Sequence, residues 1–328
     1  MTDRRAFIAA TLAVLSAPLA AQEKKETGRE YRIGVLDAIA EPANLANMDQ
    51  LRKGLKDLGY AEGKNLRIEY RTAEARNERY PALAGELARM KVDLIVANGT
   101  PATLAAKNAG GMIPVVTATA LDPVDTGLVA SLERPGGNVT GMAILTDELE
   151  KKRIELLRAI APGRKRVAVL INMGNPGLAS TWKVIEAAAT SIGLQAVLVD
   201  VRRPEKIAGA LDAAVAKRAD ALVVRVGALQ EADRRTLLDL AARHRLPAIY
   251  AQRQYVDAGG LVSYGISTPD LYYRAATFVD KILKGAKPSE LPMERPTKFE
   301  LVINRKTLKA LDLVIPPDLL LRSNEIVG

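Results

Sequence analysis

Residues 31–36 (YRIGVL) and 166–171 (RVAVLI) are short runs of mostly aliphatic and β-branched residues, and each opens one half of the chain. Three further runs of the same kind follow each of them in the same order. They begin at residues 66 (LRIEY), 92 (VDLIVA) and 113 (IPVVT) in the first half, and at 195 (QAVLV), 221 (ALVVRV) and 248 (AIYA) in the second. Such runs predict largely buried strands. Because their spacing nearly repeats, the sequence predicts two halves built on one plan.

Helical patterns separate these runs. Leu51, Leu55 and Leu58 recur at helical spacing within a segment near residues 47–58. Further helices are predicted near 80–90 and from 101 in the first half, and near 176–191, 206–216 and 233–244 in the second. Strands that alternate with helices predict parallel sheets with helices on both faces. The predicted fold class is therefore α/β, with two similar doubly wound parallel-sheet lobes joined by a hinge.

Two glycine-rich segments, 135–141 (PGGNVTG) and 259–265 (GGLVSYG), end the two halves. Two strand-like crossings between similar lobes predict a hinge. We expect Gly141 and Gly265, at the ends of these crossing strands, to absorb the conformational change when the lobes close. A helix near 270–283 is expected to return to the first lobe, and residues 299–304 (FELVIN) to add a late strand.

The composition excludes several kinds of site. The 328 residues are enough for about two domains. The chain contains no cysteine and one histidine, His244, which excludes disulfides, Cys/His zinc sites, thiol nucleophiles and most histidine-based triads. It also lacks a phosphate-binding loop, a G-x-S-x-G nucleophile motif and a dinucleotide-binding G-x-G-x-x-G after a strand. We expect no cofactor, no metal site and no enzymatic activity.

The charge pattern argues against nucleic-acid binding. The net charge of +9 comes from 47 basic and 38 acidic residues, and the basic residues are spread along the whole chain. Aromatic residues make up 4%, too few for a surface on which bases stack. No charge run is typical of a nucleic-acid-binding tail. We therefore expect a mildly basic soluble protein without a nucleic-acid partner.

The N-terminal residues 1–21 (MTDRRAFIAATLAVLSAPLAA) have the basic start, apolar stretch and small-residue end of an export signal peptide. The apolar stretch is too short and too rich in alanine to span a bilayer stably. Arg4 and Arg5 resemble a twin-arginine signal, although Asp3 stands where that pattern usually has Ser or Thr. The sequence predicts cleavage after Ala21 and a mature protein in the periplasm.

Several motifs beyond residue 97 carry a family resemblance. The most specific is RPGGNVTG at 134–141; weaker ones are NGTPA at 98–102, DPV at 122–124, GLV at 127–129, KILKG at 281–285, LP at 291–292, and Asn304 with IP at 315–316. With these motifs, residues 31–324 resemble the solute-binding proteins of bacterial ABC importers, which have the type I periplasmic-binding fold. More narrowly, they resemble the subfamily that includes tryptophan- and tyrosine-binding receptors. The resemblance implies three crossings, with residues 31–140 plus 266–296 in lobe 1 and residues 141–265 plus 297–328 in lobe 2.

The topology predicts where a ligand binds. Ligands of open parallel sheets lie beyond the carboxyl ends of the strands, and pockets favour domain interfaces. Polar residues that follow the strands, on both sides of the cleft, are therefore the candidates. In the first lobe they are Asp37, Asn98, Gly99, Thr100, Thr117, Thr119 and Asp122. In the second lobe they are Asn172, Asn175, Arg225 and Gln252, with Tyr264 as an aromatic wall near the hinge.

These candidates also have structural alternatives. Thr100 is a good helix N-cap before Pro101, although a helix N-terminus also offers free N–H groups to an anion. Asn175 likewise precedes a helix, and Asp122 precedes a proline and can simply form a turn. Arg225 interrupts an apolar run at a strand end. It either clamps a ligand carboxylate through two hydrogen bonds or is an ordinary ion-paired arginine.

Taken as a whole, the sequence predicts a periplasmic receptor of an ABC importer. It would close two lobes over a small solute and deliver the solute to a permease in the inner membrane. Arg225, the tyrosines and the resemblance favour an amino acid or a small aromatic carboxylate, and we expect a monomer. Two other classes stay open: a periplasmic ligand-sensing protein for a membrane signalling partner, and a secreted α/β enzyme that uses paired carboxylates.

Overall fold

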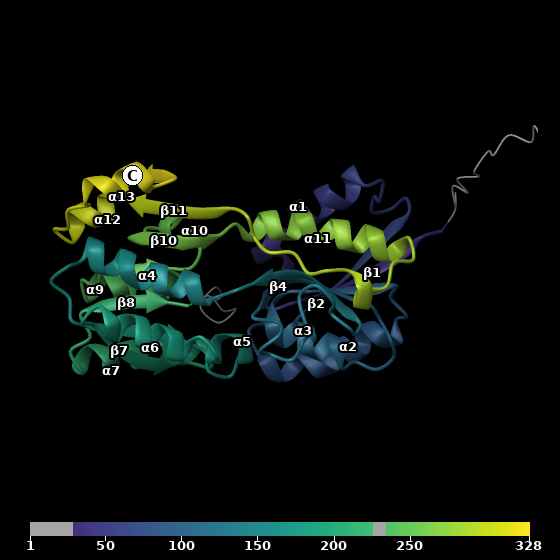
Figure 1. Cartoon of the computed structure of the whole chain (residues 1–328), viewed down its shortest axis with the longest axis horizontal. Coiled ribbons are helices and arrows are strands. Elements are labelled where there is room, and N and C mark those ends of the chain that lie inside the picture. Colours follow the sequence, from purple (N-terminus) through teal and green to yellow (C-terminus); the bar gives the residue numbers. More distant parts are fainter. Residues whose placement is uncertain (1–28, 226–233) are drawn as a thin grey trace, which may run out of the picture.

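The computed structural model of the protein describes residues 29–225 and 234–328. Two lobes lie side by side, each a sheet between layers of helices (Figure 1). The predicted export signal and the end of the run that begins at residue 221 lie outside the described residues. None of the described helices is both long enough and apolar enough to cross a membrane.

The first lobe is built on a five-stranded parallel sheet with the strand order β2-β1-β3-β4-β5. Its strands are β1 (Tyr31–Asp37), β2 (Leu66–Thr72), β3 (Leu94–Ala97), β4 (Val115–Leu121) and β5 (Val139–Ile144). Helices α1 (Leu45–Asp57) and α11 (Thr268–Leu283) pack on one face, and α2 (Tyr80–Arg89) and α3 (Gly99–Lys107) on the other. Short turns of 3-10 helix are η1 (Glu41–Asn44), η2 (Asn77–Arg79) and η4 (Pro288–Glu290). Because helices cover both faces, every residue of β3 is buried, which explains its continuous apolar run.

The second sheet has the order β12-β11-β10-β9-β8-β6-β7. Its strands are β6 (Arg166–Ile171), β7 (Gln195–Asp200), β8 (Ala221–Val224), β9 (Ala248–Tyr250), β10 (Val262–Ile266), β11 (Phe299–Asn304) and β12 (Glu325–Val327). Strands β6 to β10 repeat the order of the first sheet, and β11 pairs antiparallel with β10. This repeated order confirms the predicted α/β fold with two similar doubly wound lobes.

The helices of the second lobe also cover both faces of its sheet. Helices α4 (Asp147–Ile160), α6 (Trp182–Ser191), α12 (Arg305–Ala310) and α13 (Pro317–Arg322) pack on one face, and α7 (Ile207–Ala216) and α9 (Arg234–Arg243) on the other. Shorter elements are α5 (Pro176–Ala179), α10 (Arg253–Asp257) and η3 (Pro204–Lys206). The single helix predicted near 176–191 is two helices, and α4 was not predicted.

The chain passes between the lobes from β5 to α4, from β10 to α11, and from η4 to β11 (Figure 1). The placement of Gly141 and Gly265 at the ends of crossing strands was wrong, because both lie inside strands of a sheet. A Cβ atom at Gly141 would lie 2.3 Å from the carbonyl oxygen of Thr117, and one at Gly265 would lie 1.9 Å from that of Ala251. These glycines therefore let neighbouring strands approach closely. The predicted residue boundaries of the lobes stay a prediction.

Candidate functional site

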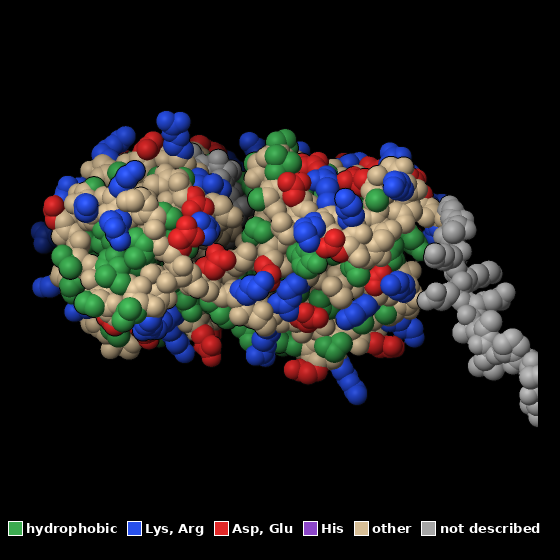
Figure 2. All heavy atoms as spheres, turned by 90° about the horizontal axis from the view of Figure 1, so that it is seen from above, with side chains coloured by type: hydrophobic (Ala, Val, Ile, Leu, Met, Phe, Trp, Pro, Cys, Tyr) green, Lys and Arg blue, Asp and Glu red, His purple; other side chains and the backbone are tan. Residues whose placement is uncertain are grey.

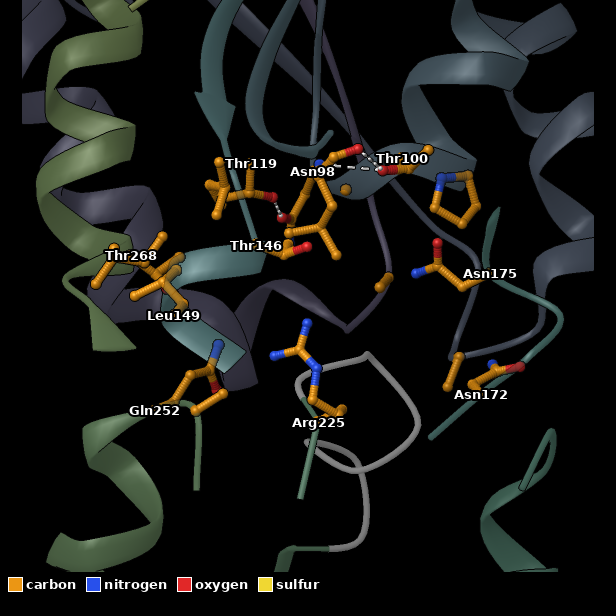
Figure 3. A pocket seen from close by; sticks show the side chains of 18 of the residues that line it. Asn98, Thr100, Thr119, Thr146, Leu149, Asn172, Asn175, Arg225, Gln252 and Thr268 are labelled. Carbon is orange, nitrogen blue, oxygen red and sulfur yellow. Dashed lines mark hydrogen bonds between the residues drawn. The ribbon is translucent and has the colours of Figure 1, made fainter. Parts of the chain in front are cut away.

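A pocket lies between the lobes, at the carboxyl ends of both sheets (Figure 3). Eight of the twelve candidate residues line it: Asn98, Gly99, Thr100, Thr119, Asn172, Asn175, Arg225 and Gln252. The other four, Asp37, Thr117, Asp122 and Tyr264, are not among its lining residues. The topological argument thus brings two thirds of the candidates together, while their contact with a solute stays a prediction.

Asp37 lies behind the first-lobe wall of the pocket and does not line it. Its side chain is fully buried and accepts hydrogen bonds from the Ala38 and Ile39 backbone N–H groups, from Asn44 and Asn98, and from the Tyr272 hydroxyl at 2.7 Å. Burial raises the pKa of the Asp37 carboxyl, although the hydrogen bonds from Tyr272 and Asn98 oppose this shift. Asp37 is therefore a positioning residue, because it fixes Asn98, which does line the pocket.

Asn98 and its neighbours form a rigid polar edge. The Asn98 amide donates to Asp37 at 3.0 Å, while its carbonyl oxygen accepts a hydrogen bond from the Thr119 hydroxyl at 2.5 Å (Figure 3). Gly99, with a φ of +83°, begins α3, so Asn98 rather than Thr100 is the N-cap residue. The Thr100 hydroxyl instead accepts from the Leu121 N–H at 3.1 Å. The expected capping role of Thr100 was therefore wrong.

The second-lobe wall is set by turns at the ends of its strands. Asn172 follows β6, and its side-chain oxygen accepts from the Gly174 N–H at 2.9 Å. Asn175 is the N-cap of α5 and accepts from the Gly177 N–H at 3.0 Å, which confirms that it opens a helix. Gln252 follows β9 and precedes α10. Asx-type turns of this kind hold the short amide side chains at the pocket edge.

A buried ion-pair network forms the floor of the pocket on the same lobe. Arg225 follows β8, and its Nη1 atom lies 2.6 Å from Glu150 Oε1. Arg153, one helical turn after Glu150 on α4, places its own Nη1 at 2.5 Å from the same oxygen. All three residues line the pocket and are at most 3% exposed. Arg225 is thus buried and ion-paired, as one of its two expected roles requires, and it also lines the pocket.

Burial dominates the electrostatics of this network. Desolvation lowers the pKa of Arg225 to about 10, against the opposing attraction of Glu150, so the guanidinium stays charged at neutral pH. Among the described residues, Glu150 Oε2 and Arg225 Nε and Nη2 have no hydrogen-bond partner. Buried charged atoms without partners are costly. A ligand that supplied both an acceptor and a donor would relieve that cost.

The candidates that do not line the pocket are buried behind it or line a second groove. Thr117 is fully buried and receives a hydrogen bond from Thr103 at 3.1 Å. Asp122 accepts from the Thr146 hydroxyl at 2.6 Å, which fixes the start of α4 next to the pocket. Asp122 and Tyr264 both line a second groove between the lobes. Burial raises the pKa of Asp122, and this residue and Asp37 act through the pocket residues that they position.

The lobes touch directly beside the pocket. The Asn77 side chain of the first lobe donates to the Gly174 carbonyl of the second at 3.3 Å. Gly177 of α5 packs against Thr100 and Leu121 of the first lobe. These contacts join the two walls across the cleft.

Sequence reasoning missed the pocket residues on α4, which include Thr146 at its N-cap and Leu149, Glu150 and Arg153 within it. A signal was available in residues 147–160. Glu150, Arg153, Ile154 and Leu157 follow helical spacing on one buried face, so two charges interrupt an otherwise apolar stripe. Charged residues are rarely fully buried unless they are paired or functional.

No metal centre is formed by the described residues, since none of their His, Asp and Glu side chains gather in a group that could hold an ion. On the face in Figure 2, Lys and Arg side chains lie interspersed with Asp and Glu over both lobes. That face therefore presents no extended basic field.

Comparisons with known proteins agree with this architecture. Residues 32–327 match the family model described as ABC transporter substrate binding protein. The chain is 29% identical over 296 residues to a tyrosine-binding protein of Clostridioides difficile (strain R20291), an alignment covering 89% of this chain and 84% of that protein.

Two solved structures of similar sequence identity superpose on this chain with different TM-scores. The ABC domain from Streptococcus pneumoniae in complex with L-tryptophan is 25% identical and superposes with a TM-score of 0.84, covering 91% of this chain and 100% of that one. A ligand-free, open substrate-binding protein with adhesive properties from Clostridium difficile is 28% identical but has a TM-score of 0.64, covering 91% and 99%. At similar identity, the chain therefore superposes better on the L-tryptophan complex than on the ligand-free, open protein.

Proposed function

Because this chain belongs to the ABC transporter substrate-binding protein family, we propose that it is a periplasmic receptor that closes its lobes over a free amino acid and delivers it to an importer permease. The single observation that carries the proposal is the inter-lobe pocket with the buried, partly unsatisfied Arg225 guanidinium in its floor. Such a group favours a ligand carboxylate, because a guanidinium can donate two parallel hydrogen bonds to it.

Two comparisons support an amino acid as the solute. One relative is a tyrosine-binding protein, and one similar structure holds L-tryptophan. Asn98, Thr119 and Asn172 would complete the site with neutral hydrogen bonds. Binding rather than chemical change is the proposed role, the mature receptor would act as a monomer, and export would place it where an importer collects its solute.

A thermal-shift screen of the common amino acids tests this proposal. A compound that binds only the folded state raises its stability by RT ln(1 + [L]/Kd), about 2.7 kcal/mol at a concentration of 100 Kd. We expect one or a few amino acids, L-tyrosine or L-tryptophan among them, to raise the melting temperature, with sugars and polyols inert as controls. Stabilisation by sugars and by no amino acid would refute the proposal.

A further inference from the structure

We infer that Glu150 and Arg225 together recognise the two charges of a free α-amino acid, with Arg225 binding its carboxylate and Glu150 its ammonium group. This inference rests on the proposed function and deepens it. It assigns the ammonium group to a residue on α4 that no sequence motif indicated, and it excludes ligands that carry only one of the two charges.

One nitrogen of the Arg225 guanidinium is paired, and the two nitrogens of another edge are buried without a hydrogen-bond partner in the described part of the chain. Its Nη1 atom contacts Glu150 Oε1, while Nε and Nη2 have no partner among the described residues. Nε and Nη2 share one edge of the planar group, the geometry that matches the two oxygens of a carboxylate. The side chain rises from the end of β8 into the pocket (Figure 3). This unpaired edge therefore favours an anion that accepts two hydrogen bonds.

Glu150 has an unpaired oxygen that complements the unpaired nitrogens of Arg225. Its Oε1 atom accepts from both Arg153 and Arg225, whereas Oε2 has no partner in the described part of the chain. The residue is fully buried and lines the pocket. A buried carboxylate oxygen needs a donor, and an ammonium group is a strong one.

The unpaired atoms belong to residues that are in contact, since Glu150 and Arg225 form an ion pair. In an α-amino acid, one carbon atom separates the carboxylate from the ammonium group, so one small headgroup reaches both. A simple carboxylate would leave Glu150 Oε2 unsatisfied, and a simple amine would leave the Arg225 edge unsatisfied. Because two guanidinium groups face one carboxylate here, we expect the ligand carboxylate to contribute more affinity than the ammonium group.

Calorimetric titration of the mature protein with three matched compounds tests the inference without any substitution. The probes are L-tyrosine, its deaminated analogue 3-(4-hydroxyphenyl)propionate and its decarboxylated analogue tyramine, with the corresponding L-tryptophan series in parallel. Relative to the amino acid, we expect at least tenfold weaker binding of the deaminated compound and at least a hundredfold weaker binding of the amine. Affinity of the deaminated compound within threefold of the amino acid would overturn this inference alone. A receptor that binds no amino acid would overturn the proposed function as well.

The variant Glu150→Gln tests whether Glu150 is the residue that binds the ammonium group of the ligand. It keeps the size of the side chain but removes its charge, so it should lose at least tenfold affinity for L-tyrosine and little for the deaminated analogue. The ratio of the two affinities is the readout, because a general loss of folding would not change that ratio. Glu148→Gln, an exposed neighbour on α4 that does not line the pocket, is the control and should keep the parental ratio. An unchanged ratio in Glu150→Gln would refute the assignment; should this variant not fold, the ligand series on the parent decides.

Discussion

Gly177 of the second lobe lies so close to Thr100 of the first that a Cβ atom at position 177 would be 2.6 Å from Thr100 Oγ1. The same atom would be 2.8 Å from the Cβ atom of Leu121. Real Cβ atoms do not approach other atoms so closely, and both obstacles belong to the opposite lobe. The missing side chain at position 177 thus permits the present arrangement of the lobes, although each lobe could fold with an alanine there.

We therefore predict that Gly177→Ala weakens amino-acid binding at least tenfold and leaves the melting temperature of the ligand-free protein nearly unchanged. The added methyl group obstructs the present arrangement of the lobes, and the nearest atoms that it would meet belong to the opposite lobe. Calorimetry with L-tyrosine or L-tryptophan measures the first effect and a melting curve the second. Gly209→Ala, at an exposed position of α7 with open space around it, is the control and should bind normally. Normal affinity in Gly177→Ala would show that binding does not require this contact.

Loss of Arg225 should affect both binding and folding. Removal of one partner of a buried charged pair commonly costs about 2–5 kcal/mol, which corresponds to roughly 30-fold to several-thousand-fold in affinity. We predict a loss of this order for Arg225→Ala and partial recovery in Arg225→Lys, because a lysine cannot form the two parallel bonds. The ligand-free melting temperature should also fall, since Glu150 loses a partner.

Titration calorimetry and melting curves measure these two effects. Arg253→Ala serves as the control for Arg225→Ala. Arg253 is an ion-paired arginine of the same lobe, but it is more exposed and does not line the pocket. Affinity of Arg225→Ala within threefold of the parent would contradict a carboxylate clamp and favour a neutral ligand held by Asn98, Thr100 and Asn172.

Asp37 should make stability depend on pH in an unusual direction. Burial raises the folded-state pKa of Asp37 above that of an unfolded aspartate, about 3.9. The resulting contribution to the free energy of unfolding is fully present below the unfolded-state pKa and is lost as pH rises through the folded-state pKa. Asp37→Asn should destabilise the protein by about 1–3 kcal/mol, because several donors converge on this side chain. Urea unfolding should show the largest difference between parent and variant near pH 4 and a smaller one at neutral pH. A difference that grew with pH would contradict the raised pKa.

Gly141→Ala should lower the free energy of unfolding rather than alter lobe closure. Its Cβ atom would meet the Thr117 carbonyl oxygen of the neighbouring strand, and such overpacking commonly costs about 1–3 kcal/mol. Gly63→Ala is a matched control, since Gly63 also has a positive φ but nothing lies within 4 Å of its added Cβ. Denaturant unfolding compares the two, and equal losses would show that close strand packing is not the cause.

The export route can be tested in cells. If Arg4 and Arg5 form a twin-arginine signal, then replacing both with lysine should leave precursor in the cytoplasm. Cell fractionation and immunoblotting of parent and variant measure this, and Asp3→Ser, which restores the usual residue of that pattern, should be exported at least as well as the parent. Unchanged export of the double-lysine variant would refute the twin-arginine route but not the periplasmic location.

The sequence predicted the repeated strands well because their signal is local. The run at 166–171 became β6 with the same bounds, since strands buried between two helix layers consist mostly of apolar residues, and the late run at 299–304 became β11. Through topology alone, the strand ends then predicted eight of the residues that line the pocket. Asp37 and Thr117 also follow or end buried runs, yet their side chains bond within their own lobe, and no local pattern distinguishes the two cases.

The floor of the pocket could not be predicted in the same way. Arg225 was recognised as an interruption of an apolar run, but its partner Glu150 lies on α4, far away in sequence. That pairing depends on how α4 packs against the second sheet, which is a tertiary property. The local sequence indicated this pairing only through the charged residues that lie beside Ile154 and Leu157 on the buried face of α4.

The hydrogen bond from Tyr272 to Asp37 spans 235 residues of sequence and has a consequence for the order of assembly. Ribosomes release β1 long before α11, so the first lobe waits for its last helix until strands β6 to β10 of the second have already emerged. Strands β6 to β10 of the second lobe follow one another in sequence and can pair during synthesis, before β11 and β12 are added. A nascent chain that stops short of α11 would leave Asp37 without Tyr272 and one face of the first sheet covered by α1 alone. Holdase chaperones that protect such exposed surfaces should therefore bind this intermediate and release it once α11 has docked.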